Sequence, residues 1–160
     1  MSALRVGVIG TGMMGEVHAR LLSERIGSAR VVAVSDPDVG RRREVADLTS
    51  YVPASEGYDL VLIVYLHLGA AELPLIIEGA ARAVAPGGRL VVVGHDVENL
   101  ERGTGGPQMA EVLTTVPGVL AALEPVGLTI DRAEVAERPV IAADGSAAIA
   151  LDTVVVGRRA

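Results

Sequence analysis

Three observations predict an α/β layer protein built on a mostly parallel sheet. The chain has 160 residues, which is enough for one continuous core. Half of the residues are hydrophobic but only 2 % are aromatic, so Val, Leu, Ile and Ala must fill the core, as in buried parallel strands and the helices that cover them. The chain also opens with strand, helix and strand patterns joined by short connections, which indicates a βαβ unit.

The first fifty residues contain this unit. Residues 4–9 form a short buried strand, apolar residues then recur at helical spacing up to Gly27, and residues 30–35 form a second strand. Residues 38–49 fit either a helix or a strand. A parallel crossover needs a dozen or more residues and too few are present, so we predict a short helix and an outer third strand that is reduced or absent.

The middle of the chain predicts a further strand, helix and strand. Residues 58–65 are almost continuously apolar, as in a central parallel strand. Residues 73–84 carry a helical apolar stripe that ends at Pro86-Gly87-Gly88, and residues 90–93 are the next strand. Residues 95–109 are polar and rich in glycine, which predicts a long loop on the functional face.

The last third predicts a capped helix and a hairpin. Thr115 can cap a helix that has Pro117 near its start. Residues 128–135 and 147–156 are strands on either side of an Ala-Asp-Gly-Ser turn. Apolar residues change from even to odd numbers within the first of them, so we expect a bulge near Asp131.

Charge and composition limit the partners. The formal net charge is −6 and all 14 basic residues are arginine, so no basic stripe for nucleic acid is expected. The chain has no cysteine, which fits a cytoplasmic protein. We expect no export signal, because the first residues lead directly into a strand, and no membrane span, because the apolar runs are short.

A glycine loop follows the first predicted strand. Gly10, Gly12 and Gly15 form G-x-G-x-x-G between a strand and a helix, where glycine permits a tight turn, a close approach to pyrophosphate and close helix packing. Asp36 ends the next strand, where a carboxylate can accept hydrogen bonds from ribose hydroxyls. The predicted cofactor-binding loop comprises Gly10, Thr11, Gly12, Met13, Met14 and Gly15.

RVGVIGTGMMGEVHAR and ARVVAVSDPD, within residues 1 to about 43, resemble the start of the inositol 2-dehydrogenase and glucose-fructose oxidoreductase family. The resemblance implies NAD, held by the three glycines and Asp36, with Asp36 disfavouring a 2′-phosphate. It also implies catalysis by a lysine in a second domain. The chain has no lysine, which excludes hydride transfer by that family's mechanism.

Residues 44–160 resemble another family. ADLTSYVPASEGYDLVLIVYLHL, APGGRLVVVGHDVENLERGTGGPQ and ALDTVVVGRRA are similar to the later two thirds of a class I S-adenosylmethionine (SAM)-dependent methyltransferase. This implies a three-layer, doubly wound Rossmann-like sheet, mostly parallel with an antiparallel last strand. With the outer third strand reduced or absent, we expect a strand order near 2-1-4-5-7-6. The resemblance also implies that Asp47 contacts adenine and that Tyr65 borders the site of methyl transfer.

At the glycine loop the sequence departs from the methyltransferase pattern. That family carries an acid two residues before the first glycine, where this chain has Val8, and its third glycine comes one residue earlier. We therefore interpret the chain as an engineered or fused chimera, one Rossmann-like domain with a junction near residues 43–47. The leading hypothesis is a domain that binds NAD or SAM without efficient catalysis. The alternatives are a small-molecule methyltransferase and a purely structural chimera with an empty cleft.

Two further features lie near the predicted cleft. His67 and His95 follow adjacent strands, with Asp96 and Glu98 just after, and these residues fit either a general base or metal site, or loop residues inherited from a lost substrate pocket. We favour the second interpretation, because no metal-ligand spacing supports the first. A reduced third strand would expose a sheet edge, so some self-association is also expected.

Overall fold

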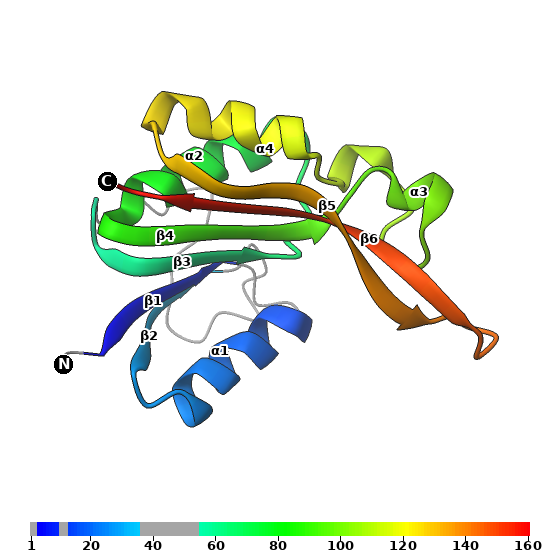
Figure 1. Ribbon diagram of the computed structural model, residues 1–160, viewed down its shortest axis with the longest axis horizontal. Coiled ribbons are helices and arrows are strands. Elements are labelled where there is room, and N and C mark those ends of the chain that lie inside the picture. Colours follow the sequence, from blue (N-terminus) through cyan, green and yellow to red (C-terminus); the bar gives the residue numbers. More distant parts are fainter. Residues whose placement is uncertain (1–2, 10–12, 36–54) are drawn as a thin grey trace.

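A six-stranded mixed sheet runs through the protein. The computed structural model describes residues 3–9, 13–35 and 55–160, and in this part the strand order is β2-β1-β3-β4-β6-β5 (Figure 1). The strands are β1 Leu4–Ile9, β2 Ala29–Ser35, β3 Tyr58–Val64, β4 Val84–His95, β5 Thr129–Ile141 and β6 Ala147–Arg158. The first four are parallel, and β6 is antiparallel to both β4 and β5. The predicted fold class is confirmed. The strand order is confirmed as well, because the predicted 2-1-4-5-7-6 becomes 2-1-3-4-6-5 when the strands are numbered without the third one.

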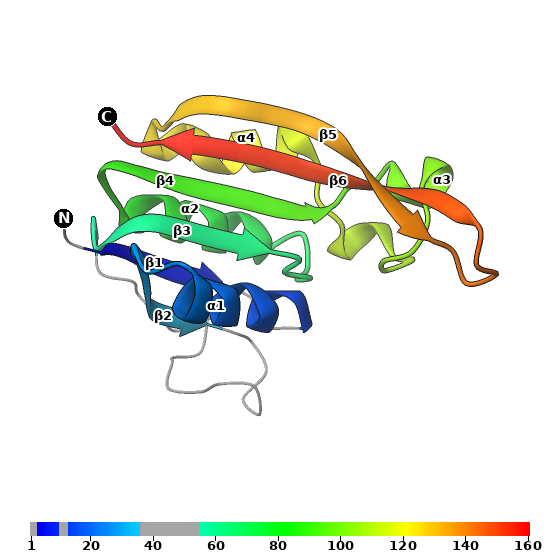
Figure 2. The same cartoon turned by 60° about the horizontal axis from the view of Figure 1, so that its bottom comes forward.

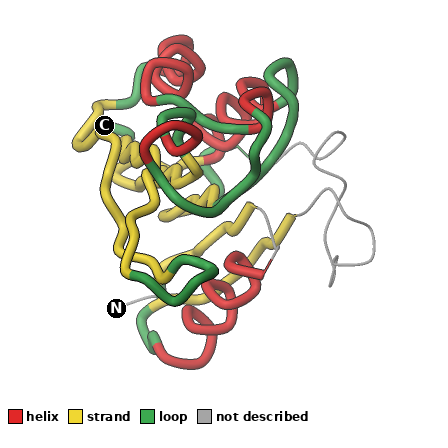
Figure 3. The backbone as a smooth tube through the Cα atoms, turned by 90° about the vertical axis from the view of Figure 1, so that its right-hand side faces the viewer, coloured by secondary structure: helices red, strands yellow, loops and turns green. Residues whose placement is uncertain are grey.

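Helices lie on both faces of this sheet (Figures 1 and 3). α1, Met13–Arg25, packs against β1 and β2 on one face, whereas α2, Leu73–Ala83, and α4, Val116–Leu123, lie together on the other. The core between α2, α4 and the sheet is aliphatic, as the low aromatic content predicts. Its most buried members include Ile63, Ile77, Leu90, Val119 and Val155.

The βαβ unit predicted at the start of the chain is confirmed. β1 pairs with β2 from Leu4 beside Ala29 to Ile9 beside Ser35, and α1 ends two residues before Gly27. The short helix predicted at 38–49 lies outside the described residues. β2 and β5 are the outer strands of the described sheet, and the expected self-association stays a prediction.

The boundary between α2 and β4 differs from the prediction. α2 begins at Leu73 with Pro74 in its first turn, as expected, but it ends at Ala83. Val84, predicted as the last helical residue, begins β4 and pairs with Tyr58. Gly88 allows the backbone to pass close to its neighbours here, because a Cβ there would come within 2.9 Å of the carbonyl oxygens of Ala85 and Asp59.

The polar segment after β4 is not simply the loop that its composition predicts. It contains a short helix, α3, Asn99–Arg102, and ends in a 3-10 turn at Ala110–Val112. The buried side chain of Asn99 holds this segment to the sheet. Its Oδ1 accepts a hydrogen bond from the Leu151 N–H at 2.8 Å, and its Nδ2 donates to the Gly105 carbonyl at 2.7 Å. Hydrogen bonding to a neighbouring strand, which composition does not reveal, therefore orders this segment.

The β5–β6 hairpin is longer than predicted. The two strands pair as far as Ile141 beside Ala147, so β5 extends six residues beyond the expected end at Val135. The register shifts between Ile130 and Arg132, which confirms the bulge expected near Asp131. The turn of the hairpin lies at the opposite end of the molecule from the carboxyl terminus (Figures 1 and 2).

Thr115 caps α4 as predicted, and its removal should have a measurable cost. Its hydroxyl oxygen accepts a hydrogen bond from the Gly118 N–H at 3.0 Å. We expect Thr115→Ala to lower the free energy of unfolding by about 1 kcal/mol, because one N–H of the first helical turn loses its partner. Urea denaturation measures this. Thr115→Ser keeps the hydroxyl and should stay close to the wild type, whereas an equal loss in both variants would contradict the capping role.

Candidate functional site

The carboxyl ends of the parallel strands meet at one edge of the sheet. Ile9, the last residue of β1, pairs with Ile63 near the end of β3, and Val64 pairs with Val93 near the end of β4. In open α/β sheets, ligands bind outside the carboxyl ends of the strands. This edge is therefore the candidate site for a small molecule.

The predicted cofactor loop begins at this edge. Gly10, Thr11 and Gly12 lie outside the described residues, between the end of β1 and the start of α1. Met13, Met14 and Gly15 are the first three residues of α1. Asp36, which follows β2 directly in the chain, and Asp47 also lie outside the described residues. Their contacts to a cofactor therefore stay predictions.

Val8 occupies the position at which methyltransferases carry an acid. Its side chain is only 1 % exposed, in β1 between β2 and β3. A carboxylate without a partner is very unfavourable at so buried a position. The site thus offers an apolar side chain where the amino group of methionine would need a negative charge.

A compact polar cluster stands at the carboxyl edge, formed by Tyr65, His95, Arg138 and Asp152. Asp152 in β6 lies directly opposite His95 in β4 and is 3 % exposed. Its Oδ2 accepts hydrogen bonds from the Tyr65 hydroxyl at 2.8 Å and from Arg138 Nε at 2.7 Å. Arg138 Nη2 donates to Oδ1 at 3.3 Å, so the guanidinium holds both carboxylate oxygens.

These contacts set the protonation states of the cluster. Burial by itself raises the pKa of a carboxyl group, but the neighbouring His95 and the hydrogen bonds from Arg138 and Tyr65 outweigh it and hold the pKa of Asp152 at about 2. Burial and then the Asp152 carboxylate raise the pKa of Tyr65 to about 12. At neutral pH, Asp152 is therefore charged and the Tyr65 hydroxyl is a hydrogen-bond donor.

A second imidazole, that of His67, lies beside the cluster. The rings of His67 and His95 are stacked, with centroids 5.8 Å apart and planes within 6° of parallel, and the centroid of the Tyr65 ring is 4.8 Å from that of His95. His95 Nδ1 is 3.4 Å from Asp152 Oδ1, although the direction of approach does not make a hydrogen bond. Burial, and then the charge of the nearby His95, lower the pKa of His67.

Asp96 and Glu98 do not join these histidines. Asp96 is 2 % exposed and accepts hydrogen bonds from the Thr153 hydroxyl and the Glu98 N–H, so it supports the fold beneath the cluster. Glu98 forms an exposed ion pair with Arg102. Within the described part of the chain, no three or more His, Cys, Asp or Glu side chains are placed to hold a metal ion.

Sequence reasoning identified Tyr65, His67 and His95 but missed Arg138 and Asp152. Asp152 had a signal, because it is the lone acid within the apolar stretch AIALDTVVV, where a buried charge requires a partner. Arg138 had none, since alternating charges are ordinary in an outer strand.

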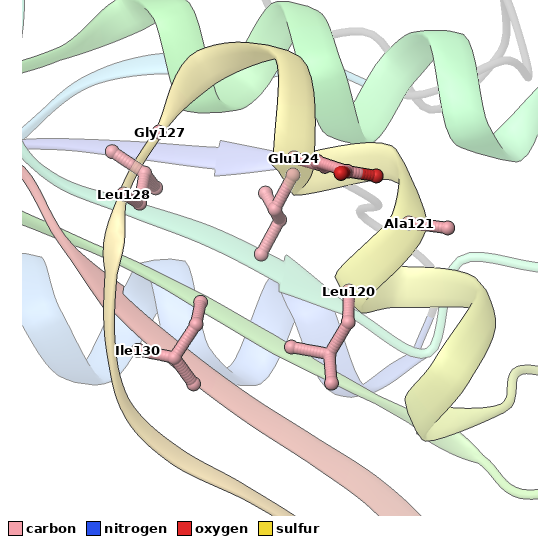
Figure 4. A pocket seen from close by; sticks show the side chains of 7 residues that line it. Leu120, Ala121, Glu124, Gly127, Leu128 and Ile130 are labelled. Atoms are coloured by element: carbon pink, nitrogen blue, oxygen red, sulfur yellow. The ribbon is translucent and has the colours of Figure 1, made fainter.

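A hollow of about 450 Å³ lies elsewhere, between α4 and the start of β5 (Figure 4). Its walls are mainly aliphatic, formed by residues such as Leu120, Leu128 and Ile130, with Glu124 as the one ionisable side chain. Ile130 pairs with Gly157, which in turn pairs with Leu90, five residues before His95 along β4. The hollow is thus away from the carboxyl edge and lacks the groups for chemistry.

Comparison with known proteins confirms the resemblance of the first part of the chain. Residues 4–67 match the model of an oxidoreductase family with an NAD-binding Rossmann fold. Inositol 2-dehydrogenase 1 of Saccharopolyspora erythraea is 60 % identical over 43 residues, 27 % of this chain and 13 % of that enzyme. Inositol 2-dehydrogenase of Rubrobacter xylanophilus is 36 % identical over 81 residues, 47 % of this chain and 23 % of that enzyme. The chain thus spans about a quarter or less of these relatives.

Comparison of structures confirms the methyltransferase-like fold over the whole chain. A SAM-dependent methyltransferase from Mesorhizobium loti superposes with a TM-score of 0.64 at 15 % identity, covering 99 % of this chain and 92 % of that one. A putative methyltransferase from Bacillus halodurans gives a TM-score of 0.67 at 12 % identity, covering 99 % and 94 %. At such low identity the likeness shows the fold alone.

In the described part of the chain, no helix is long and apolar enough to cross a membrane.

The two comparisons overlap in the chain. The oxidoreductase model extends to residue 67, beyond the junction expected near 43–47, and therefore includes β3. A buried, continuously apolar parallel strand fits either family. The chain therefore combines an amino-terminal segment that matches an NAD-binding family model with a methyltransferase-like fold.

Proposed function

We propose that the chain is one Rossmann-like domain, an engineered or fused chimera, that binds NAD or SAM at the carboxyl edge of β1 and β2 without efficient catalysis. The observation that carries this is the G-x-G-x-x-G sequence set between β1 and α1, inside a segment that matches an NAD-binding family model. Helix N–H groups then face the pyrophosphate, and Asp36 accepts hydrogen bonds from the ribose hydroxyls.

The glycine loop favours NAD over SAM. Its spacing is that of a dinucleotide site, and Val8 offers no charge to the amino group of methionine. Efficient hydride transfer by the mechanism of the matching family would need a lysine, and this chain has none. The first point supports binding of NAD, and the second supports the absence of efficient hydride transfer by these 160 residues.

A methyltransferase is the second candidate, and the polar cluster favours it. Tyr65, His95 and Asp152 gather at the carboxyl edge of β3 and β4 in a fold that matches methyltransferases along its full length. In this candidate, Asp36 holds the ribose of SAM, Asp47 contacts adenine, and residues 95–108 shape the pocket for a small methyl acceptor.

Calorimetric titration with NAD, NADH, SAM and S-adenosylhomocysteine, each in a separate cell, distinguishes these candidates. Saturable heat from the nicotinamide pair supports the leading proposal. Binding of the adenosyl pair alone fits the SAM-binding form of the leading proposal and is also the one result compatible with the methyltransferase. Absence of heat from all four ligands contradicts both and leaves a structural chimera with an empty cleft.

Asp36→Ala should lower the affinity for the cofactor by roughly tenfold or more, because the ribose hydroxyls lose a charged hydrogen-bond acceptor. The same titrations measure the loss, and urea denaturation should show little change in the free energy of unfolding. Asp38→Ala, which removes the same charge two residues along the chain, is the matched control. An equal loss of affinity in both variants would show a general charge effect and contradict the role of Asp36.

A further inference from the structure

We propose that His95, oriented by Asp152, is the proton acceptor of a small-molecule site at the carboxyl ends of β3 and β4, for ligands with a hydroxyl or amine group. The inference rests on the proposed function only in that a cofactor would lie along the same edge of the sheet. The proton chemistry itself depends on residues that the structure describes.

Asp152 is fixed in a position that favours one form of the His95 ring. Arg138 holds both carboxylate oxygens, the Tyr65 hydroxyl holds one, and β4 and β6 place Asp152 directly opposite His95. The carboxylate thus lies 3.4 Å from Nδ1. A negative charge at this distance stabilises a proton on Nδ1, which leaves the lone pair of Nε2 free. Catalytic hydrogen bonds are often this long without ligand and shorten when ligand binds.

Part of the His95 side chain remains exposed although its Nδ1 is buried. Nδ1 is fully buried, whereas 14 % of the His95 side chain is exposed. Gly106 lies next to the ring with φ +75°, and a Cβ there would come within 2.9 Å of Nε2. Glycine at this position keeps a side chain from pressing on the ring beside Nε2, and the stacked His67 ring forms a second, flat wall.

The proposed proton transfer breaks one bond in the ligand and forms one bond to His95. The O–H or N–H bond of the ligand breaks, its electron pair stays on the oxygen or nitrogen, and the proton forms a bond with Nε2. The imidazolium that results is stabilised by the Asp152 carboxylate, as in a histidine that acts as general base beside an aspartate. The ligand atom keeps the electron pair and is thereby left with one more free lone pair than before the transfer.

Nitrogen-15 NMR of the histidine side chains tests the orientation without any ligand. The chain has only three histidines, His18, His67 and His95, so the signals can be assigned with single variants. At neutral pH we expect His95 to carry its proton mainly on Nδ1 in the wild type. In Asp152→Asn this preference should be lost, while His18 keeps its signal. A proton mainly on Nε2 in the wild type would overturn the proposal, whatever the stability of Asp152→Asn.

Acylation by diethyl pyrocarbonate tests the free lone pair, because the reagent attacks a neutral imidazole nitrogen. The chain has no cysteine and no lysine to compete for the reagent, and mass spectrometry locates the acylated histidine. We expect acylation of His95 to slow several-fold in Asp152→Asn, because without the carboxylate beside Nδ1 less of the neutral ring carries its proton on Nδ1 and presents a free lone pair at Nε2. The rate at His18 should stay unchanged and serves as the internal control.

Equal rates at His95 in the wild type and in Asp152→Asn would contradict the proposal. Neither experiment uses NAD or SAM, so failure of the cofactor titrations would refute the proposed function and leave this result standing. Conversely, an unreactive His95 in a protein that binds its cofactor would refute only the proton acceptor.

Discussion

Asn99→Ala is expected to lower the free energy of unfolding by about 3 kcal/mol, a large effect for one amide in a short helix. Asn99 is 2 % exposed and bridges two segments far apart in the chain, since it accepts from the Leu151 N–H and donates to the Gly105 carbonyl. Alanine leaves this donor and this acceptor without their partner and opens a small cavity. Urea denaturation at neutral pH measures the loss.

Gly103→Ala tests the same contact from the other side. A Cβ at position 103 would come within 1.8 Å of Asn99 Oδ1, so the amide would have to leave its place. We therefore expect a loss close to that of Asn99→Ala. In the double variant the clash with the amide disappears, so the second substitution should add little, which makes the pair strongly non-additive.

Gly79→Ala is the matched control for this pair. Gly79 lies within α2, and a Cβ there meets no atom within 4 Å. Alanine should stabilise the protein by about 0.5 to 1 kcal/mol, because glycine is a poor residue inside a helix. Additive losses from Asn99→Ala and Gly103→Ala, or a loss below about 1 kcal/mol from the first, would show that Asn99 does not hold the segment after β4.

The parts of the fold that sequence predicted are those decided by neighbours in the chain. The cap at Thr115 depends on a hydroxyl and an N–H three residues apart, and the bulge near Asp131 depends on a change of parity within one strand. The start of β4 was missed because Val84 fits the apolar stripe of α2 equally well. Only its pairing with Tyr58, 26 residues earlier, places it in the sheet.

The candidate site also has a part that the sequence predicts and a part that only the folded sheet reveals. The glycine loop and Asp36 can be identified from spacing alone, because each residue has a defined offset from a strand or helix. The polar cluster cannot, since Tyr65 and Asp152 are 87 residues apart and meet only when β6 inserts beside β4. An acid within an apolar strand shows that a partner exists, but its identity depends on the sheet order.

Asp152→Asn is expected to remove about 2 kcal/mol of stability at neutral pH, and the loss should disappear in acid. The pKa of Asp152 falls from 3.8 to about 2 on folding, through His95 and the hydrogen bonds from Arg138 and Tyr65, against the effect of burial. A depressed pKa contributes stability above the unfolded value, and this stability is lost as the pH falls through the folded value. The difference of nearly two units corresponds to about 2 kcal/mol.

The pH profile separates this charge from all others. Urea denaturation of the wild type and Asp152→Asn should differ by a constant amount above about pH 4, and the two should converge between about pH 4 and pH 2. Other carboxylates, such as Asp59 with its lowered pKa, titrate in both proteins and cancel in the difference. Glu137→Gln, at an exposed position of the adjacent β5, should follow the wild type at every pH. A difference between wild type and Asp152→Asn that persists unchanged at pH 2 would mean that the asparagine disturbs packing, and that the charge of Asp152 does not stabilise the cluster.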